Sequence, residues 1–208
     1  WAAPGDWSDR MFDDIPEHVR ARMITLETID GRDRHDGTSR QARLRQIAPE
    51  SGRFLTFLAA CAPEGAYVEV GTSGGYSTLW IALACRATGR RVVTCEVDPG
   101  KAELARQTFQ LAQVEDVVQL HVGDARDVLR HSDNLSFCFL DTEKDLYAEC
   151  YELAVARMVP GGLLVADNAI SHADELRGFL GVVFHDPRVD ALVVPVGNGQ
   201  LLCRRREA

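Results

Sequence analysis

The chain has 208 residues, enough for one domain with a full-sized hydrophobic core. Its 23 Lys and Arg against 31 Asp and Glu give a net charge of −8, which disfavours a general binder of nucleic acids or other polyanions. No apolar run approaches the ~20 residues that a membrane-spanning helix needs, so we expect no membrane partner.

Residues 1–45 are polar, and we expect them to form a helical and loop-rich extension on the substrate or dimer side of the molecule. A helix is predicted over residues 16–26, with Ile24 and Leu26 on its apolar side. A charged loop over residues 30–37 follows. Its two glycines and alternating charges predict a mobile or substrate-facing segment.

Several arginines gather in a short span against the acidic balance of the chain. They are Arg32, Arg34, Arg40, Arg43, Arg45 and Arg53. A solvated face is the simplest interpretation of such a cluster. The alternatives are a site for a small anionic group of a substrate, or a site for an RNA phosphate.

The remaining residues, 46–208, are predicted to form a single domain in which strands and helices alternate. A helix that begins at Pro49 carries Phe54, Leu55, Phe57 and Leu58. Apolar runs predict strands over residues 67–70, 91–96, 117–122, 135–140 and 163–166. Such alternation indicates a parallel α/β sheet with helices on both faces.

Three helices are expected between these strands, over residues 77–85, 101–113 and 146–158. In the second of them Leu104, Phe109 and Leu111 are the predicted buried positions, and the run Pro160-Gly161-Gly162 is predicted to end the third. At the end of the chain, residues 191–196 and 200–204 flank Gly197-Asn198-Gly199 and predict an antiparallel hairpin.

A glycine-rich turn follows the first strand, with Glu69, Gly71 and Gly75 in a Glu-x-Gly-x-x-x-Gly pattern. This spacing does not match the Gly-x-Gly-x-x-Gly of dinucleotide enzymes, and no nucleotide-triphosphate loop follows it. Glu69 would repel a pyrophosphate but tolerate an ammonium and a sulfonium, which favours S-adenosylmethionine as the ligand. Ser77 is predicted to cap the next helix. A purely structural turn is the alternative.

Polar residues close the other strands, where ligands of open parallel sheets bind. Glu96 lies 21 residues beyond Gly75, near the spacing at which an acid accepts hydrogen bonds from ribose hydroxyls. Asp124 and Ala125 are predicted to meet the adenine edge, through a side chain and a backbone N–H. A simple turn explains this pair almost as well.

Asp141, Asp167 and Asn168 close two strands that we expect to be adjacent, so their oxygen atoms should converge. Two carboxylates and an amide suit Mg²⁺, Ca²⁺ or Mn²⁺ and not zinc. Local capping and turn formation would explain either strand end alone. Lys144, three residues after Asp141, would stand beside such an ion and take a proton from a hydroxyl. Among the histidines, only His172 is positioned in the sequence to line a pocket.

The six cysteines are scattered, and none forms a Cys-x-x-Cys pair, so neither a zinc site nor a redox pair is indicated. We expect them to be reduced in a cytoplasmic protein. The first residues show no signal-peptide pattern.

Together these motifs resemble the class I S-adenosylmethionine-dependent O-methyltransferases, and more closely the cation-dependent group that contains the catechol and caffeoyl-CoA enzymes. The resemblance covers residues 45–205, and its most specific part is the Asp141-x-x-Lys144-x-x-Tyr147 run with the later Asp167-Asn168. The other matching segments are 68–77, 94–98, 123–125, 160–162 and the hairpin at 195–199.

This resemblance implies a Rossmann-like, seven-stranded sheet with an antiparallel last strand, and a homodimer. It implies that Asp141, Asp167 and Asn168 hold the metal, that Lys144 is the base, and that Asp141 also serves catalysis. It further implies that Gln46-Ile47 covers the methionine end of the cofactor, whose carboxylate Ser77 binds. The implied cofactor site comprises Ile47, Glu69, Gly71, Ser73, Gly75, Ser77, Glu96, Val97, Asp124, Ala125 and Asp141.

The expected function is divalent-metal-dependent transfer of a methyl group from S-adenosylmethionine to a hydroxyl of a small, ortho-dihydroxy aromatic acceptor. The alternatives are O-methylation of a hydroxyuridine in tRNA, which only the arginine cluster supports, a cofactor-binding module without turnover, and a dehydrogenase, which the glycine spacing disfavours. The chain has Glu143 and Asn198 where relatives often have Asp, and both differences concern the identity of the acceptor.

Overall fold

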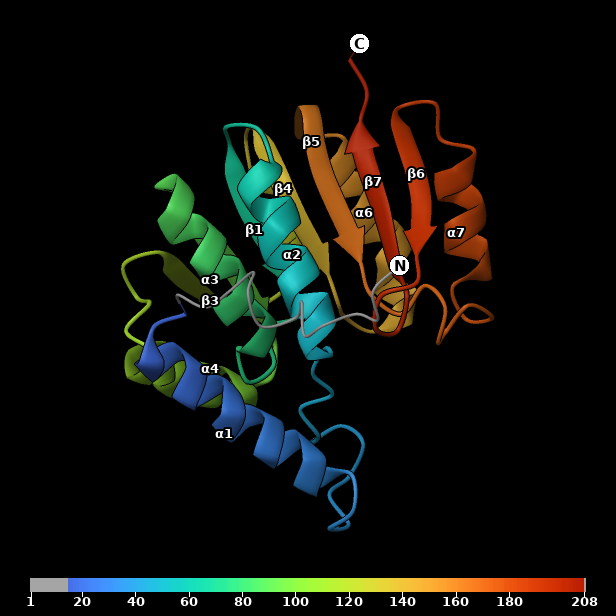
Figure 1. Cartoon of the computed structure of the whole chain (residues 1–208). Helices are drawn as coiled ribbons and strands as arrows, with labels where there is room; N and C mark the ends of the chain where they lie inside the picture. Colours follow the sequence, from blue (N-terminus) through green and yellow to red (C-terminus); the bar gives the residue numbers. More distant parts are fainter. Residues whose placement is uncertain (1–14, 208) are drawn as a thin grey trace, which may run out of the picture.

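The computed structural model describes residues 15–207, so the first part of the predicted extension, residues 1–14, lies outside the described residues. Within the described part, a seven-stranded sheet forms the centre of the molecule, and helices cover both of its faces (Figure 1). The strands are β1 Ala66–Val70, β2 Val92–Glu96, β3 Val118–Val122, β4 Leu135–Leu140, β5 Met158–Ala166, β6 Val189–Val194 and β7 Gln200–Arg205.

The strand order is β3-β2-β1-β4-β5-β7-β6. The pairs from β3 to β5 are parallel, whereas β7 runs antiparallel to both β5 and β6. The predicted parallel sheet with an antiparallel C-terminal hairpin is therefore confirmed. The adjacency predicted for the strands that end before Asp141 and Asp167 is also confirmed, because β4 and β5 are hydrogen-bonded neighbours.

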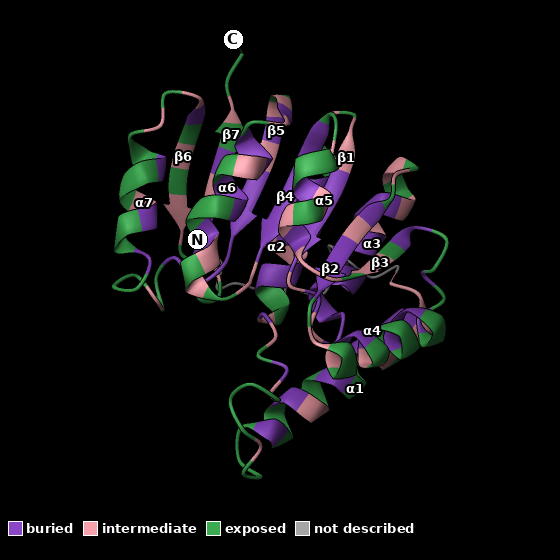
Figure 2. Ribbon diagram, turned by 180° about the vertical axis from the view of Figure 1, so that it is seen from behind, coloured by how far each residue is buried: buried purple, intermediate pink, exposed green. Residues whose placement is uncertain are grey.

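Two hydrophobic cores lie on opposite faces of the sheet. One is formed with α1 Glu17–Asp33, α2 Pro49–Cys61, α3 Tyr76–Thr88 and α4 Pro99–Leu111. The other is formed with α5 Ala125–His131, α6 Tyr147–Val155 and α7 Arg177–Phe184 (Figure 2). The nearly continuous apolar runs of the inner strands follow from this arrangement, because β4 is buried along its whole length.

Helix α1 is longer than predicted. It ends at Asp33, so the first part of the segment 30–37, which was expected to form a charged loop, is helical. Asp30 stabilises its last turn by accepting two hydrogen bonds from Arg34, at 2.9 and 2.6 Å, and one from the backbone N–H of Gln46. These contacts outweigh the low helix propensity of Gly31. Leu26 is buried as predicted, but the prediction for Ile24 was wrong, since its side chain is 56% exposed.

Other predictions of local structure need correction. Leu111 was predicted to be buried, but as the last residue of α4 it is 59% exposed, whereas Phe109 is buried as predicted. Pro160-Gly161-Gly162 does not end a helix: α6 already ends at Val155, and the run lies inside β5. The β4–β5 register shifts next to it, and such irregularities accommodate proline in sheets.

Helices α5 and α7 are not among the elements predicted from the sequence, and the residue after β4 leads first into a short 3₁₀ turn, Lys144–Leu146. In the described part of the chain, no helix is both long enough and apolar enough to cross a bilayer.

Candidate active site

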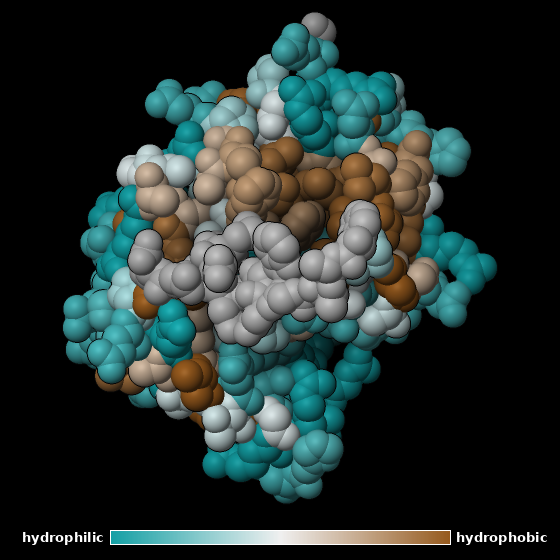
Figure 3. All heavy atoms as spheres, in the orientation of Figure 1, coloured by the Kyte–Doolittle hydropathy of each residue, from teal (hydrophilic) through white to brown (hydrophobic). Residues whose placement is uncertain are grey.

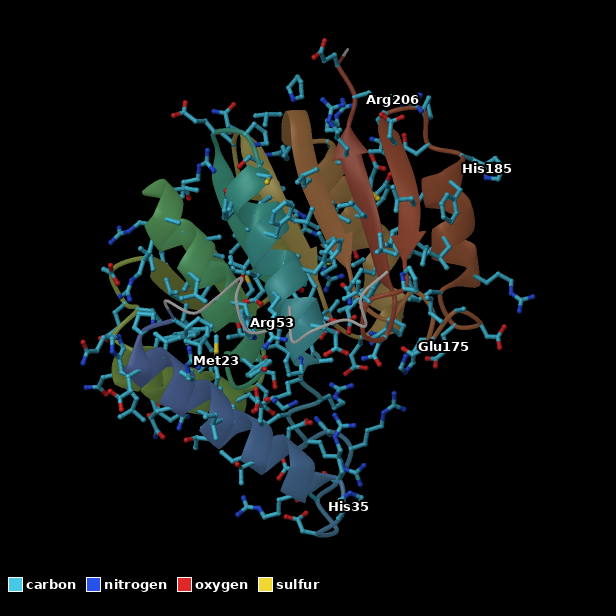
Figure 4. The ribbon with its side chains drawn as sticks, in the orientation of Figure 1. Met23, His35, Arg53, Glu175, His185 and Arg206 are labelled. Atoms are coloured by element: carbon cyan, nitrogen blue, oxygen red, sulfur yellow. The ribbon has the colours of Figure 1, made fainter. Side chains whose placement is uncertain are left out.

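A cavity of about 840 Å³ opens at the carboxyl edge of the parallel strands. The ends of β1, β2, β3 and β4 form its floor, and the segment after α1, from Arg34 to Ile47, forms a wall across it. In Figure 1 this segment lies below the carboxyl edge of the sheet. Figure 4 shows His35 at its far tip, and Glu175 beside the carboxyl edge on the side of α7.

The glycine-rich turn brings the end of β1 against the residue that follows β4. Gly71 has a φ of 100°, and a Cβ at this position would overlap the backbone carbonyl oxygen of Asp141. Gly75 has a φ of 91° and is the N-cap of α3. Glycine is required at both positions because an L side chain rarely adopts this conformation. The turn thereby exposes backbone N–H groups of the α3 N-terminus toward the cavity side.

Glu69 lies behind the cavity wall and not on it. Its fully buried carboxylate accepts hydrogen bonds from the hydroxyls of Ser77, at 2.6 Å, Thr94, at 2.6 Å, and Thr78. Burial raises the pKa of Glu69 to about 6, against the effect of these three donors. Ser77 therefore does not cap α3 as predicted, because its hydroxyl donates to Glu69; it does line the cavity.

Glu96 ends β2 and faces the cavity with a carboxylate that backbone groups hold in place. The N–H of Ser73 donates to one carboxylate oxygen at 2.7 Å, and the N–H of Asp98 donates to the other at 2.9 Å. The Ser73 hydroxyl donates to the carbonyl oxygen of Leu44 at 2.8 Å, which ties the glycine-rich turn to the wall segment. A carboxylate anchored in this way is a well-oriented acceptor for ligand hydroxyls.

Val97, Asp124 and Ala125 line the same part of the cavity, and the Val97 side chain is 70% exposed. The Asp124 carboxylate is already engaged: it caps α5 through the N–H of Arg126 and pairs with the Arg126 guanidinium. These hydrogen bonds lower the pKa of Asp124 to about 2. Asp124 therefore forms the local turn that was considered from the sequence.

Ile47 and Gln46 close the cavity from the wall segment. Ile47 is buried, and Gln46 places its side-chain oxygen where it is buried and has no hydrogen-bond partner among residues 15–207. Buried amide oxygens are almost always paired in folded proteins. An unpaired one on a cavity wall marks a position for a donor group of a ligand.

Asp141, Asp167 and Asn168 are held at neighbouring strand ends by the backbone ladder. The N–H of Asp141 donates to Val70 at 2.9 Å, and the N–H of Asp167 donates to Leu140 at 3.0 Å. Burial, with repulsion from the Asp167 carboxylate, raises the pKa of Asp141 to about 7. Asp141 and Asn168 line the cavity, whereas Asp167 lies just behind them. The Asp167 carboxylate accepts a hydrogen bond from the Asn168 amide nitrogen at 2.8 Å.

Lys144 reaches into this group from the 3₁₀ turn after β4. Its Nζ donates to the Asn168 amide oxygen at 2.5 Å and to the Tyr147 hydroxyl at 2.9 Å, and lies 3.8 Å from a carboxylate oxygen of Asp141. Its side chain is only 15% exposed. Burial lowers the pKa of Lys144, and the neighbouring carboxylates oppose that shift.

The described residues contain no group of three or more His, Cys, Asp and Glu side chains arranged to hold a metal ion. The set at the β4 and β5 ends has two carboxylates, and Asn168 supplies the third oxygen. Oxygen-only sets of this kind suit hard divalent cations. The pKa of Asp141 stays raised by burial and by the Asp167 carboxylate although the charges of Lys144 and Arg45 oppose the shift, and a bound cation would relieve this condition.

Some residues of the site were not recognised from the sequence as functional. Tyr147 is buried and accepts from Lys144, and Gln200 is fully buried and donates to Asp167. Arg45 pairs with Glu143 across the cavity mouth at 2.7 Å. Two of these positions had a signal in the sequence: Tyr147 lies in the Asp141-x-x-Lys144-x-x-Tyr147 run, and Arg45 belongs to the arginine cluster that was considered as an anion site. His172 lines the cavity as predicted.

Comparisons with known proteins identify the family and the fold. A sequence profile of the O-methyltransferase family matches residues 34–206. A catechol O-methyltransferase of Niastella koreensis is 35% identical over 129 residues, which cover 60% of this chain and 58% of that protein. A caffeoyl-CoA O-methyltransferase of Mesembryanthemum crystallinum is 26% identical over 187 residues, covering 78% and 73% of the two chains. The chain thus spans less than two thirds of the length of the catechol relative.

Solved structures share the fold. The O-methyltransferase from Bacillus cereus in complex with SAH superposes with a TM-score of 0.76 at 23% identity, covering 97% of this chain and 96% of that one. The O-methyltransferase TomG from Streptomyces achromogenes, in complex with SAM, gives a TM-score of 0.74 at 23% identity, with coverages of 97% and 95%. On the family match over residues 34–206, this chain belongs to the O-methyltransferase family.

Proposed function

We propose that the protein transfers the methyl group of S-adenosylmethionine to a hydroxyl of a small ortho-dihydroxy aromatic acceptor, with a divalent cation, Mg²⁺ in first place, as cofactor. One observation carries the proposal. The anchored carboxylate of Glu96 and the glycine-rich turn line the same cavity as Lys144, Asp141 and Asn168. A site for the methyl donor and a proton-accepting group would therefore share one cavity.

The cofactor would lie along the carboxyl edge from β4 to β3. Glu96 would accept from the ribose hydroxyls, and Val97 with Ala125 would flank the adenine. Asp124 would stabilise the turn before α5 through its hydrogen bond with Arg126. The adenine would then be contacted by the backbone N–H of Ala125. At the methionine end, Ile47 would cover the ligand, and Gln46 offers its unpaired oxygen to the ammonium group.

The glycine-rich turn would receive the carboxylate of the cofactor. Gly71 and Gly75 allow close approach of the backbone, and Ser73 and Ser77 stand on either side of the α3 N-terminus. Glu69 would act on this end of the cofactor only indirectly, through the Ser77 hydroxyl that it holds.

Asp141, Asp167 and Asn168 would hold the cation, whose positive charge would lower the pKa of the reacting hydroxyl. Lys144 then takes the hydroxyl proton on Nζ while the oxygen attacks the methyl carbon in line with the sulfur. The C–S bond breaks, its electron pair stays on sulfur, and the products are the methyl ether and S-adenosylhomocysteine. Tyr147 and Asn168 orient Nζ for this role.

The test is transfer of labelled methyl groups to 3,4-dihydroxy aromatic compounds with Mg²⁺ and with EDTA. We expect turnover that EDTA abolishes and that Asp141→Ala removes. Asp174→Ala, which changes an acid that is 93% exposed, should leave turnover intact. Cofactor binding without any turnover would identify a binding module instead, and unchanged activity in Asp141→Ala with EDTA would contradict the metal role.

We also propose a cytoplasmic homodimer with the extension ending near residue 45. All six cysteines are unpaired, which fits a reducing compartment. Figure 3 shows hydrophobic side chains gathered over α2 and the β5–β7–β6 end of the sheet, where Phe57 and Leu192 are each 53% exposed. Such a patch is typical of an interface between subunits. Leu192→Lys should convert the dimer to a monomer in light scattering; a wild-type monomer would contradict the proposal.

A further inference from the structure

The wall segment concentrates positive charge on one side of the cavity. Arg34, Arg40, Arg43 and Arg45 all line it. Two of them are neutralised by carboxylates: Arg34 pairs with Asp30 at 2.6 Å, and Arg45 pairs with Glu143 at 2.7 Å. The other two arginines are not paired with any carboxylate of residues 15–207.

Arg40 makes no hydrogen bond or ion pair within the part of the chain that the structure describes, and it is exposed at the cavity. Arg43 is half-buried and donates from Nε to the carbonyl oxygen of Thr38 at 2.9 Å. No described carboxylate lies within ion-pair distance of Arg43, so its other guanidinium N–H groups face no counter-charge. A solvated loop face would not require these two side chains to point at the cavity.

Arg40 stands on the acceptor side of the cavity, close enough to Glu143 to act on its charge, and Arg43 follows three residues later in the same wall segment and lines the same cavity. The hydrogen bond from Arg45 is the main cause of the lowered pKa of Glu143, and the charges of Lys144 and Arg40 add to it. Arg40 and Lys144 therefore both lie within electrostatic range of Glu143. Glu143 belongs to the loop that also carries Asp141.

We propose that Arg40 and Arg43 form an anion subsite that selects acceptors carrying a carboxylate or phosphate group in addition to the reacting hydroxyl. This inference rests on the proposed function, because it names the class of acceptor for the same cavity. A guanidinium binds either anion through charge-assisted, often bidentate hydrogen bonds.

Carboxylates in the same cavity limit how much negative charge an acceptor can carry. Glu143, Asp145 and Glu175 line the cavity together with the arginines, and the cavity as a whole has as many acidic as basic side chains. An extended polyanion such as RNA would meet these carboxylates, whereas a compact acceptor with one anionic group meets only the two arginines. The balance therefore favours a small aromatic acid over tRNA.

The test compares two acceptors that differ in charge but hardly in shape, 3,4-dihydroxybenzoate and 3,4-dihydroxybenzamide. Calorimetry on the protein holding S-adenosylhomocysteine measures binding of each, and methylation assays measure kcat/KM. We expect the acid to be favoured at least about tenfold in both. The double variant Arg40→Gln, Arg43→Gln should lose this preference by weakening the acid alone.

Arg32→Gln is the matched control, because Arg32 lies in the last turn of α1, just before the wall segment, pairs with Asp36 and does not line the cavity. It should keep the preference, and 0.5 M salt should reduce it in the wild-type protein. Equal binding of acid and amide, or a preference that survives in the double variant, would overturn the inference. Because binding is measured without turnover, this failure is distinct from failure to methylate any ortho-dihydroxy compound, which would refute the proposed function.

Two further acceptors identify the source of the anion. Preference for the coenzyme A thioester of 3,4-dihydroxycinnamate over the free acid, lost in the double variant, assigns the subsite to phosphate. Equal or better use of the free acid assigns it to carboxylate. Methylation of bulk tRNA that depends on Arg40 and Arg43, without a preference for the acid over the amide, would replace the proposal by an RNA site.

Discussion

At the scale of single residues, Lys144 has the geometry of a proton acceptor. Its Nζ has three hydrogen-bond partners, the carbonyl of Thr142 at 3.1 Å among them, so that its direction is fixed. It is one of only two lysines in the chain. Arginine in its place would preserve the positive charge beside Asp141 but could not accept a proton at neutral pH.

We therefore predict that Lys144→Gln and Lys144→Arg both lower kcat by roughly 10²- to 10⁴-fold. Binding of S-adenosylhomocysteine, measured by calorimetry, should stay within about twofold, because Lys144 lies on the acceptor side. If Lys144→Arg retained wild-type turnover, the side chain would supply charge and not a base.

Glu69 predicts a pH dependence of stability. Its pKa is raised from 4.5 to about 6 in the fold, so the folded chain binds a proton that the unfolded chain releases between these values. Stability then decreases as the pH rises from about 4.5 to 6, by about 2 kcal/mol in total, and levels off above that range.

Glu69→Gln removes this titration. Urea unfolding at pH 4.5 and pH 7 should show that the variant loses less stability than the wild-type protein as the pH rises. Glu103→Gln, on the exposed face of α4, should follow the wild-type profile. Parallel profiles for Glu69→Gln and the wild-type protein would contradict the raised pKa.

The sequence locates the residues at strand ends but not what they bind. Glu96, Asp141 and Asn168 reach the cavity because parallel strands carry their carboxyl ends to one edge. The partners of Glu69 and Asp167 could not be predicted in this way. Ser77, Thr94 and Gln200 meet those acids only through the packing of separate elements.

At the scale of elements, the glycine-rich turn is fixed by the close approach of two strand ends. Gly71→Ala is predicted to destabilise the protein by about 3 kcal/mol or more, because the added methyl group meets a backbone carbonyl at positive φ. Gly181→Ala in α7 is the contrast, since nothing lies within 4 Å of the added methyl group.

Gly181→Ala should stabilise the protein by about 0.5–1 kcal/mol through helix propensity. Thermal and urea unfolding of the two variants measure both effects. Equal stabilities for Gly71→Ala and the wild-type protein would show that the turn does not contact the end of β4 as described.

The Arg45–Glu143 pair links the wall segment to the loop after β4 across 98 residues of sequence. Its side chains are 39% and 62% exposed, so the pair is worth only about 0.2–1 kcal/mol. Glu143→Ala should therefore speed release of S-adenosylhomocysteine about two- to fivefold at low salt, as measured by stopped flow.

The control is Glu103→Ala, which breaks an ion pair of α4 away from the cavity. The effect of Glu143→Ala should shrink in 1 M salt and vanish in the Arg45→Ala background. An unchanged release rate at low salt would mean that the pair does not restrain the wall segment.

The errors in predicting elements also have physical causes. The burial of Ile24 and Leu111 was predicted from the apolar pattern of each helix, but Ile24 lies on the exposed face of α1 next to buried Met23, and Leu111 is the exposed last residue of α4. Pro160-Gly161-Gly162 has the composition of a helix end, yet β5 absorbs it beside a shift in register. Composition gives the conformational preference of a segment, and packing against distant elements decides the outcome.

At the scale of the whole molecule, topology converts a list of polar residues into a site. Because β1 lies between β2 and β4, the loop after it is central to the carboxyl edge, with Glu96 on one side and Asp141 on the other. The alternation of strands and helices predicts a parallel sheet whose strand ends share one edge, and the Gly197-Asn198-Gly199 turn predicts the antiparallel hairpin that contains β7. The wall segment is not predictable from alternation, since its position depends on Ser73 and Asp30.

The central claim is that the ends of β4 and β5 hold a divalent ion beside the methyl donor. The most direct measurement is anomalous scattering from crystals of the protein grown with S-adenosylhomocysteine and Mn²⁺. We expect one strong anomalous-difference peak about 2.2 Å from oxygen atoms of Asp141, Asp167 and Asn168. Ordered ligand in the cavity with no peak among these three side chains would contradict it.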